Sequence, residues 1–342
     1  MRIAALDLGS NSFHMVVADV HADGTFSPTI REKEMLRLGE EVTRDGVISE
    51  ASADAAVACI RRFRKLAEAA GATEVQARAT SAFRSAANGD ALVDRIEREA
   101  GVVVDVIDGI EEARLIFTAV RAAVVLEPPP AICFDLGGGS LEITVGDRSG
   151  LHWSTSERLG VGRLSARFVT EDPLPREQRR AMRDHVAEVL RPVADATTPF
   201  APQLAVGSSG TFESIATMCA IARDGAAPSS LNQSVLRLED VLAIYRPITR
   251  GTRAERRAIP GMDAKRVDLI AAGVVVLRTV LEVFDLSEIT ISDWALREGI
   301  VLDAIAAHEP EELDAASGSI RIGSVLSLAR RCSWPEIGRA HV

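Results

Sequence analysis

The chain has 342 residues, 47% hydrophobic and 26% charged, which is typical of a globular protein large enough for two domains. A formal net charge of −10 argues against nonspecific binding to nucleic acid or to an anionic membrane, and aromatic residues, at 4%, are too few for a base-stacking platform. The longest apolar run, from Leu269 to Leu277, is too short to cross a bilayer.

The N-terminal sequence has no charged and then apolar leader, so we expect no secretory signal. The four cysteines show no paired spacing, and we expect reduced thiols in a cytoplasmic protein. The six histidines show no metal-ligand spacing, which argues against a zinc site.

The first half of the chain predicts three strands followed by alternating helices and strands. Hydrophobic periodicity predicts strands at 2–8, 13–20, near 34–38, 74–79 and 102–107 (the last one buried), and helices at 50–70, 89–100 and 111–125. Asp108 is a suitable N-cap for the last helix, with Glu111 as its capping-box partner.

The second half repeats that order after Pro128, Pro129 and Pro130, which end the preceding helix. The pattern predicts strands at 131–136, 141–146, 151–158, 204–206 and 288–292, and helices at 176–191, 212–221, 239–246, 264–284 and from about 295. We expect a surface loop over 223–235.

Two copies of one loop support a duplication. Residues 6–12 read LDLGSNS and residues 134–140 read FDLGGGS, so that Asp135 lies 128 positions after Asp7. Residues 80–85 resemble 209–214 at nearly the same offset, and constant spacing over about 80 residues is unlike a chance match. In each loop, small residues let backbone N–H groups approach an anion, and the preceding Asp is placed to hold a metal or a water.

These observations predict an α/β protein of two ribonuclease-H-like (actin-like ATPase) domains, related by a pseudo-twofold duplication, with an interdomain cleft. We expect the domains to span 1–125 and 126–305, followed by a helical extension over 306–335. Residues 336–342 match one translated frame of a common sequencing adapter, so we expect this tail to be non-native.

Five segments together resemble the exopolyphosphatase/guanosine pentaphosphate phosphatase (Ppx/GppA) family, a branch of the actin-like, sugar-kinase and heat-shock ATPase superfamily. The matching segments are 7–14, 109–115, 135–142, 207–211 and 292–299, and the resemblance runs to about residue 305. Two departures are the lack of room for the C-terminal helical domains of larger members, and Trp294, where a small residue is commoner in the family.

The resemblance implies an exopolyphosphatase that removes the terminal phosphate of inorganic polyphosphate. The motifs do not separate it from a guanosine pentaphosphate (pppGpp) hydrolase. Two further alternatives are a kinase of the same superfamily and an inactive regulator that binds guanosine tetraphosphate. A homodimer is expected from the family alone.

The resemblance assigns Glu112 as the base that orients or activates water, and it assigns Asp135 and Glu142 to Mg²⁺, with Mn²⁺ as a substitute. Asp7, the duplicate of Asp135, is a weaker candidate metal ligand. Arg84 is a candidate phosphate clamp. Each residue also has a purely structural interpretation. Glu112 could stabilise a helix N-terminus and Asp135 could cap a turn, while Glu142 could be an exposed strand residue and Arg84 part of a surface salt bridge.

The candidate phosphate-binding residues are the small polar residues and glycines of the duplicated turns. They are Ser10, Asn11, Ser12, Gly138, Gly139, Ser140, Gly207, Ser208, Ser209, Gly210 and Thr211. Arginine-rich stretches at 176–183 and 246–266 either extend a track for a polyanion or are solvated helix faces. His14 matches a family position, but a structural role is expected for it.

Overall fold

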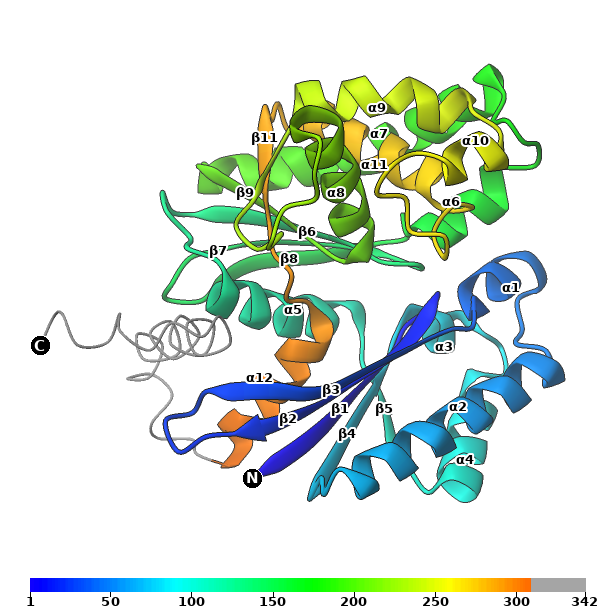
Figure 1. Cartoon of the computed structure of the whole chain (residues 1–342), viewed down its shortest axis with the longest axis vertical. Coiled ribbons are helices and arrows are strands. Elements are labelled where there is room, and N and C mark those ends of the chain that lie inside the picture. The colour runs from blue at the N-terminus through cyan, green and yellow to red at the C-terminus, as the bar shows by residue number, and fades with distance from the viewer. Residues whose placement is uncertain (309–342) are drawn as a thin grey trace, which may run out of the picture.

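The computed structural model describes residues 1–308, so the suspected tail at 336–342 and nearly all of the expected extension over 306–335 lie outside the described residues. The chain forms two α/β lobes, each built around one mixed sheet (Figure 1). The lobes are stacked, with the blue N-terminal sheet below the green second sheet in that view.

The first sheet has the strand order β3-β2-β1-β4-β5, with β1, β2 and β3 antiparallel and β4 and β5 parallel to β1. Its strands are β1 (Arg2–Leu8), β2 (Ser12–Val20), β3 (Phe26–Met35), β4 (Glu74–Ala79) and β5 (Val104–Val106). The helices of this half are α1 (Leu38–Asp45), α2 (Glu50–Ala69), α3 (Ser81–Ser85), α4 (Gly89–Ala100) and α5 (Gly109–Ala123).

The second sheet has the order β10-β11-β9-β6-β7-β8. Its strands are β6 (Ala131–Leu136), β7 (Leu141–Gly146), β8 (Leu151–Glu157), β9 (Leu204–Ser208), β10 (Val235–Arg237) and β11 (Glu288–Ile291). Its helices are α6 (Val161–Phe168), α7 (Arg176–Thr197), α8 (Gly210–Asp224), α9 (Leu238–Arg250), α10 (Arg253–Arg257), α11 (Ile270–Val283) and α12 (Leu296–His308), with a 3₁₀ turn η1 (Thr198–Phe200).

The predicted duplication is confirmed by topology and register. With β10 set aside, the second sheet repeats the strand order of the first. The positions of β1, β2, β3, β4 and β5 are taken, in that order, by β6, β7, β8, β9 and β11. In the first hairpin Asp7 is opposite His14, and in the second Asp135 is opposite Glu142. The same two positions therefore carry Asp and His in one lobe and Asp and Glu in the other.

Strand alternation explains why the central strands are buried on both faces. In β1, Ala4 and Leu6 face the core of the first lobe, whereas Ile3 and Ala5 face a core that lies between the two sheets. In β6, Phe134 faces the core of the second lobe. Both faces of each sheet are therefore covered, as expected for sheets with parallel strands.

Two helices cross between the lobes. Helix α5 follows the first sheet in the chain but packs on β7 and β8 of the second, and α12 follows the second sheet but packs on β1 and β2 of the first (Figure 1). Leu115 and Phe117 of α5 and Ile300 and Val301 of α12 share the core between the sheets. This exchange fixes one lobe against the other beneath the cleft.

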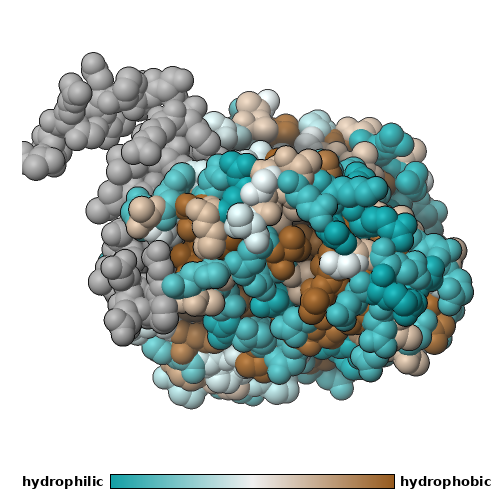
Figure 2. All heavy atoms as spheres, turned by 90° about the horizontal axis from the view of Figure 1, so that it is seen from below, coloured by the Kyte–Doolittle hydropathy of each residue, from teal (hydrophilic) through white to brown (hydrophobic). Residues whose placement is uncertain are grey.

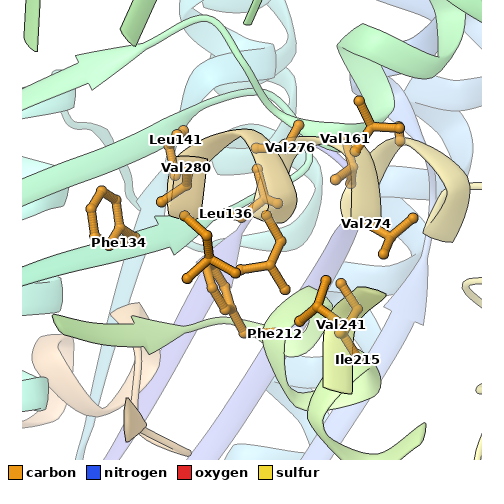
Figure 3. Packing of buried hydrophobic residues seen from close by; sticks show 14 of the residues in the cluster. Phe134, Leu136, Leu141, Val161, Phe212, Ile215, Val241, Val274, Val276 and Val280 are labelled. Carbon is orange, nitrogen blue, oxygen red and sulfur yellow. The ribbon is translucent and has the colours of Figure 1, made fainter. Parts of the chain in front are cut away.

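The core of the second lobe lies between its sheet and the helices of one face (Figure 3). Phe134 and Leu136 of β6 and Leu141 of β7 meet valines of α11, while Phe212 and Ile215 come from α8. All the labelled side chains are apolar and buried, so this packing holds the loops after β6 and β9 in a rigid frame.

Several local predictions need correction. The third strand runs over Phe26–Met35 rather than 34–38, because a turn at Asp23 and Gly24 returns the chain directly against β2. Residues 102–107 form only the short edge strand β5, and Val103 is 69% exposed. Glu111 forms no capping box; it pairs with Arg114, while Asp108 caps α5 as predicted.

Helix lengths also differ from the prediction. Helix α7 continues through Pro192 to Thr197, and α11 begins at Ile270 rather than at 264. The short helices α1, α3 and α6 were not predicted, because each spans only five to eight residues and is fixed by contacts with the cleft loops.

The surface seen from below carries apolar side chains in small groups among hydrophilic ones (Figure 2). No helix within residues 1–308 combines the length and the apolar character that crossing a membrane requires. Cys59, Cys133 and Cys219 are buried free thiols, and Cys332 lies outside the described residues.

Candidate active site

A cavity of about 470 Å³ lies between the lobes, at the ends of the central strands. It is lined by most of the predicted site residues, from both halves of the duplication. These are Asp7, Ser10, Asn11, Ser12, Glu112, Asp135, Gly138, Gly139, Ser140, Ser209, Gly210 and Thr211. Four predicted residues do not line it. Arg84 lies behind Glu112, Glu142 is hydrogen-bonded to the lining residue Ser140, and Gly207 and Ser208 lie in β9 behind the cavity.

The two duplicated loops touch at the floor of the cavity. A Cβ added at Gly138 would lie 2.7 Å from Asn11 Cβ, and one added at Gly139 would lie 2.4 Å from Ser10 Oγ. These distances are far below ordinary contact, so glycine is required for the second loop to lie against the first. The loops therefore form one continuous polar surface.

Two side-chain oxygens on this surface have no partner. Ser10 Oγ and Asn11 Oδ1 are buried, yet neither makes a hydrogen bond with any other described residue. A buried polar atom without a partner costs free energy. Their position at the loop contact fits a site completed by a bound polar ligand.

Glu112 lies in the first turn of α5, three residues after Gly109, and is only 7% exposed. Arg84 Nη1 donates to its Oε2 at 2.9 Å and to the carbonyl oxygen of Ile107 at 2.6 Å. Burial raises the pKa of Glu112 to about 7, although Arg84 opposes that rise. Glu112 is thus held in one orientation and poised between its charged and neutral forms near neutral pH.

Three further carboxylates lie near Glu112, and burial raises the pKa of each. Burial raises the pKa of Asp7 to about 7, and Arg297 opposes this; burial raises the pKa of Asp135 to about 6, and a hydrogen bond from Ser208 Oγ at 2.5 Å opposes it. Glu142, which accepts from Ser156 Oγ at 2.8 Å, has a pKa far above its usual range because of burial and the nearby charge of Glu112.

This carboxylate cluster fits a divalent cation. Within residues 1–308, no three His, Cys, Asp or Glu side chains converge closely enough to hold a metal ion by themselves. Mg²⁺, however, takes one or two carboxylates and completes its octahedron with waters and phosphate oxygens. A cation beside Asp7 and Asp135 would favour the charged forms of these carboxylates, which burial disfavours.

Four basic side chains line the cavity as well. Arg31, Lys33, Arg266 and Arg297 converge here from β3, from the turn before α11 and from α12. Burial and the charge of Arg266 lower the pKa of Lys33 to about 8. A cavity that contains both acids and cations can hold a polyanion together with its counter-ion.

His14 connects this basic group to the first loop. Arg297 Nη1 lies 3.2 Å from His14 Nδ1, and His14 Nε2 lies 2.7 Å from Ser12 Oγ. Because a guanidinium only donates, Nδ1 must accept, so the neutral ring carries its proton on Nε2 and donates it to Ser12. Burial and the nearby cations hold the pKa of His14 well below its usual value. The Ser12 hydroxyl is then free to donate to a ligand.

Comparison with known proteins identifies the family. A sequence model described as the Ppx/GppA phosphatase family matches residues 16–308. The chain belongs to the Ppx/GppA phosphatase family. Among curated relatives, Exopolyphosphatase 1 from Mycobacterium tuberculosis and that from Mycobacterium bovis are each 35% identical to it over 309 residues, which cover 88% of both chains.

Solved structures agree with this Ppx/GppA assignment. The crystal structure of an exopolyphosphatase from Cytophaga hutchinsonii is 33% identical, with a TM-score of 0.83 over 90% of this chain and 98% of that one. The Ppx/GppA family member from Aquifex aeolicus is 26% identical, with a TM-score of 0.74 over 90% of this chain and 99% of that one. The predicted actin-like two-domain fold is thereby confirmed.

The basic residues that line this Ppx/GppA site were not assigned to it from the sequence. Arg297 lies within the family-like segment 292–299, and Arg266 ends the arginine-rich stretch 246–266. Neither was assigned to the site. Lys33 was missed because the third strand was placed too late, whereas its register opposite His14 puts it in the cleft. A correct strand over 26–35 would have supplied the signal.

Proposed function

We propose that this Ppx/GppA protein is an exopolyphosphatase, which hydrolyses the terminal phosphoanhydride bond of inorganic polyphosphate and releases orthophosphate. The observation that carries the proposal is the position of Glu112. It is buried, it accepts a hydrogen bond from Arg84, and it lines the same cavity as the two duplicated loops, which contact each other. The relatives named exopolyphosphatase match this chain over nearly its whole length, which supports the same activity.

The loops hold the terminal phosphate in this proposal. Ser10, Asn11 and Ser12 from the first loop and Gly138 to Ser140 from the second offer backbone N–H groups and hydroxyls to its oxygens. Ser209 to Thr211, where α8 begins, face the same cavity and would take a neighbouring phosphate at a helix N-terminus. Positioning of this kind supplies much of the catalysis in phosphoryl transfer.

Mg²⁺ would be held by Asp135 and Asp7, which line the cavity, with Glu142 opposite Asp135 on the neighbouring strand, and would neutralise charge on the phosphates. Glu112 orients the attacking water and accepts its proton. A pKa of about 7 suits a base that works near neutral pH. Arg84 keeps the Glu112 carboxylate pointed at the water and stays one side chain removed from the cavity.

Polyphosphate is favoured over guanosine pentaphosphate by the lining. Among the described residues that line the cavity there is no Phe, Tyr or Trp, so no aromatic ring is available to stack on a guanine. The lining is instead mostly polar and charged. The predicted homodimer and cytoplasmic location stay predictions.

The test compares Glu112→Gln with Glu111→Gln in an orthophosphate-release assay on polyphosphate with Mg²⁺. The two residues are neighbours, but Glu111 is half-exposed and pairs with Arg114 outside the cavity. We expect E112Q to lose about 10²–10⁴-fold in kcat while it still binds polyphosphate, as expected for loss of a general base. E111Q should keep kcat. Near-normal turnover by E112Q would refute the role of Glu112.

A further inference from the structure

A second cavity, of about 510 Å³, lies on the helical layer of the second lobe, away from the cleft. Helices α7, α9 and α11 lie together in the upper lobe (Figure 1). The lining is one tyrosine and seven arginines: Arg176, Arg179, Arg180, Arg183, Tyr245, Arg246, Arg250 and Arg278. We call this feature the arginine cavity.

Helix geometry explains why so many arginines meet there. Residues 176, 179, 180 and 183 follow the i, i+3, i+4, i+7 pattern and share one face of α7, over ~10 Å of its axis. Arg246 and Arg250 are four residues apart on α9 and share a face likewise. The packing of α7 and α9 on α11 then brings the two faces together.

The charge in the arginine cavity is not balanced. Within residues 1–308, Arg176, Arg179, Arg246 and Arg250 have no carboxylate partner, and Arg180 and Arg183 share the single carboxylate of Asp184. Arg278 pairs with Glu282 at 2.7 Å, so two carboxylates face seven arginines. Arginines of nearby α10 behave differently. Arg253 is neutralised by Asp268 at 2.6 Å and Arg256 by Asp172 at 2.7 Å.

Such unpaired guanidinium groups repel one another in a chain whose net charge is −10. Guanidinium groups spread over three helices match a ligand that carries several phosphates, because each can take phosphate oxygens in a two-pronged geometry. A single orthophosphate would leave most of them unpaired.

The ligand is unlike a nucleic acid. The only aromatic ring of the arginine cavity, Tyr245, is 8% exposed, and Arg278 lies over it at 4.7 Å from the centroid. The described lining of this cavity therefore presents no free ring on which a base could stack. The acidic chain as a whole also repels nucleic acid, which leaves a linear phosphate chain as the best match.

We infer that the arginine cavity is a second polyphosphate-binding site, which holds a part of a long chain outside the catalytic cleft. The inference rests on the proposed function for the identity of its ligand. Helix α11 connects the two places. Its Gly273 packs on Thr211 of the cleft, and Arg278 in the arginine cavity lies ~8 Å further along the axis. Short chains would fill the cleft alone, and long chains would engage both sites.

The test compares R246Q/R250Q with R191Q/R257Q. All four arginines are exposed, none has a carboxylate partner among the described residues, and each double variant removes two positive charges. Only the first pair lines the arginine cavity. KM and kcat are measured on tripolyphosphate and on long-chain polyphosphate, and affinity is measured by equilibrium binding in an added Glu112→Gln background.

We expect R246Q/R250Q to weaken affinity for long-chain polyphosphate about fivefold, as two exposed ion pairs would, with tripolyphosphate kinetics unchanged. R191Q/R257Q should change neither. Equal long-chain affinities for the two variants would overturn the inference, as would an RNA homopolymer that competes for the cavity as well as polyphosphate does. If no polyphosphate releases orthophosphate, the proposed function fails, and the binding comparison still decides the inference separately.

Discussion

The contact between the two loops can be tested with one methyl group. Gly139→Ala adds a Cβ at the point where the second loop meets the first. That Cβ would lie 2.4 Å from Ser10 Oγ, 2.6 Å from Ser81 Oγ and 2.8 Å from Ser81 Cβ. Gly139 has no positive φ, so alanine fits the backbone there and the whole effect is one of packing.

The size of the effect follows from these distances. Ordinary contact for a Cβ begins at 3.4 Å, so the Ser10 and Ser81 hydroxyls must turn away and the second loop must move away from Ser81 Cβ to admit the methyl group. Overpacking of a tight site costs ~1–3 kcal/mol of stability, and a misplacement of about 1 Å in a phosphate-positioning site can lower the rate ~10²-fold. We therefore expect G139A to fold, with a modest loss of Tm and a much larger loss of kcat.

The control is Gly137→Ala, two residues away in the same loop. Its added Cβ would lie 3.4 Å from the carbonyl oxygen of Ser140, at ordinary contact, and its φ is also not positive. Orthophosphate release from tripolyphosphate and thermal unfolding are measured for both variants. If G139A and G137A have the same kcat, the idea that the abutting loops position the terminal phosphate is refuted.

Two further predictions concern protons and metal. First, kcat/KM should rise with pH through about 7, because Glu112 must be deprotonated to accept a proton from water, and a flat profile would contradict that role. Second, the pKa values of Asp7 and Asp135 are raised to about 7 and about 6 in the folded protein. The protonated forms of both residues therefore stabilise the fold at low pH, and this stabilisation is lost as the pH rises through these values. Mg²⁺ added to chelator-treated protein should therefore raise Tm more at about pH 8 than at about pH 5, and Asp135→Asn should reduce the difference; an equal Tm shift at both pH values would argue against the site.

Local sequence was sufficient for much of the fold. Strands β1, β4, β6 and β7 and helix α4 were predicted at or within a residue of their bounds, because each has a clear period and an unambiguous turn at its ends. The offset between Asp7 and Asp135 predicted the duplication, since homologous turns keep their spacing from homologous strands. The offset related Asp135 to Asp7, and the resemblance supplied Glu112 and Glu142, but Glu213 and Asp293, which also line the cavity, were not assigned to the site.

The crossing of α5 and α12 was not in the sequence pattern. Helix α5 is apolar on one face and α12 is buried on nearly all sides, and neither pattern says on which sheet the helix will pack. Similarly, Gly207 and Ser208 belong to the expected turn by sequence but lie inside β9, because the strand pairs with β6 for two residues longer than expected.

What the sequence determined by itself is the set of chemical groups and their order: two turns with an Asp before each, a Glu at the start of a helix, and a surplus of arginines on two helices. What only the tertiary structure decided is which of these groups meet. The burial that raises the pKa of Glu112, the contact of Gly139 with Ser10 and the meeting of α7 with α9 all join residues far apart in the chain. Burial and electrostatic repulsion depend on distances through space, and a periodicity read along the chain carries no such distances.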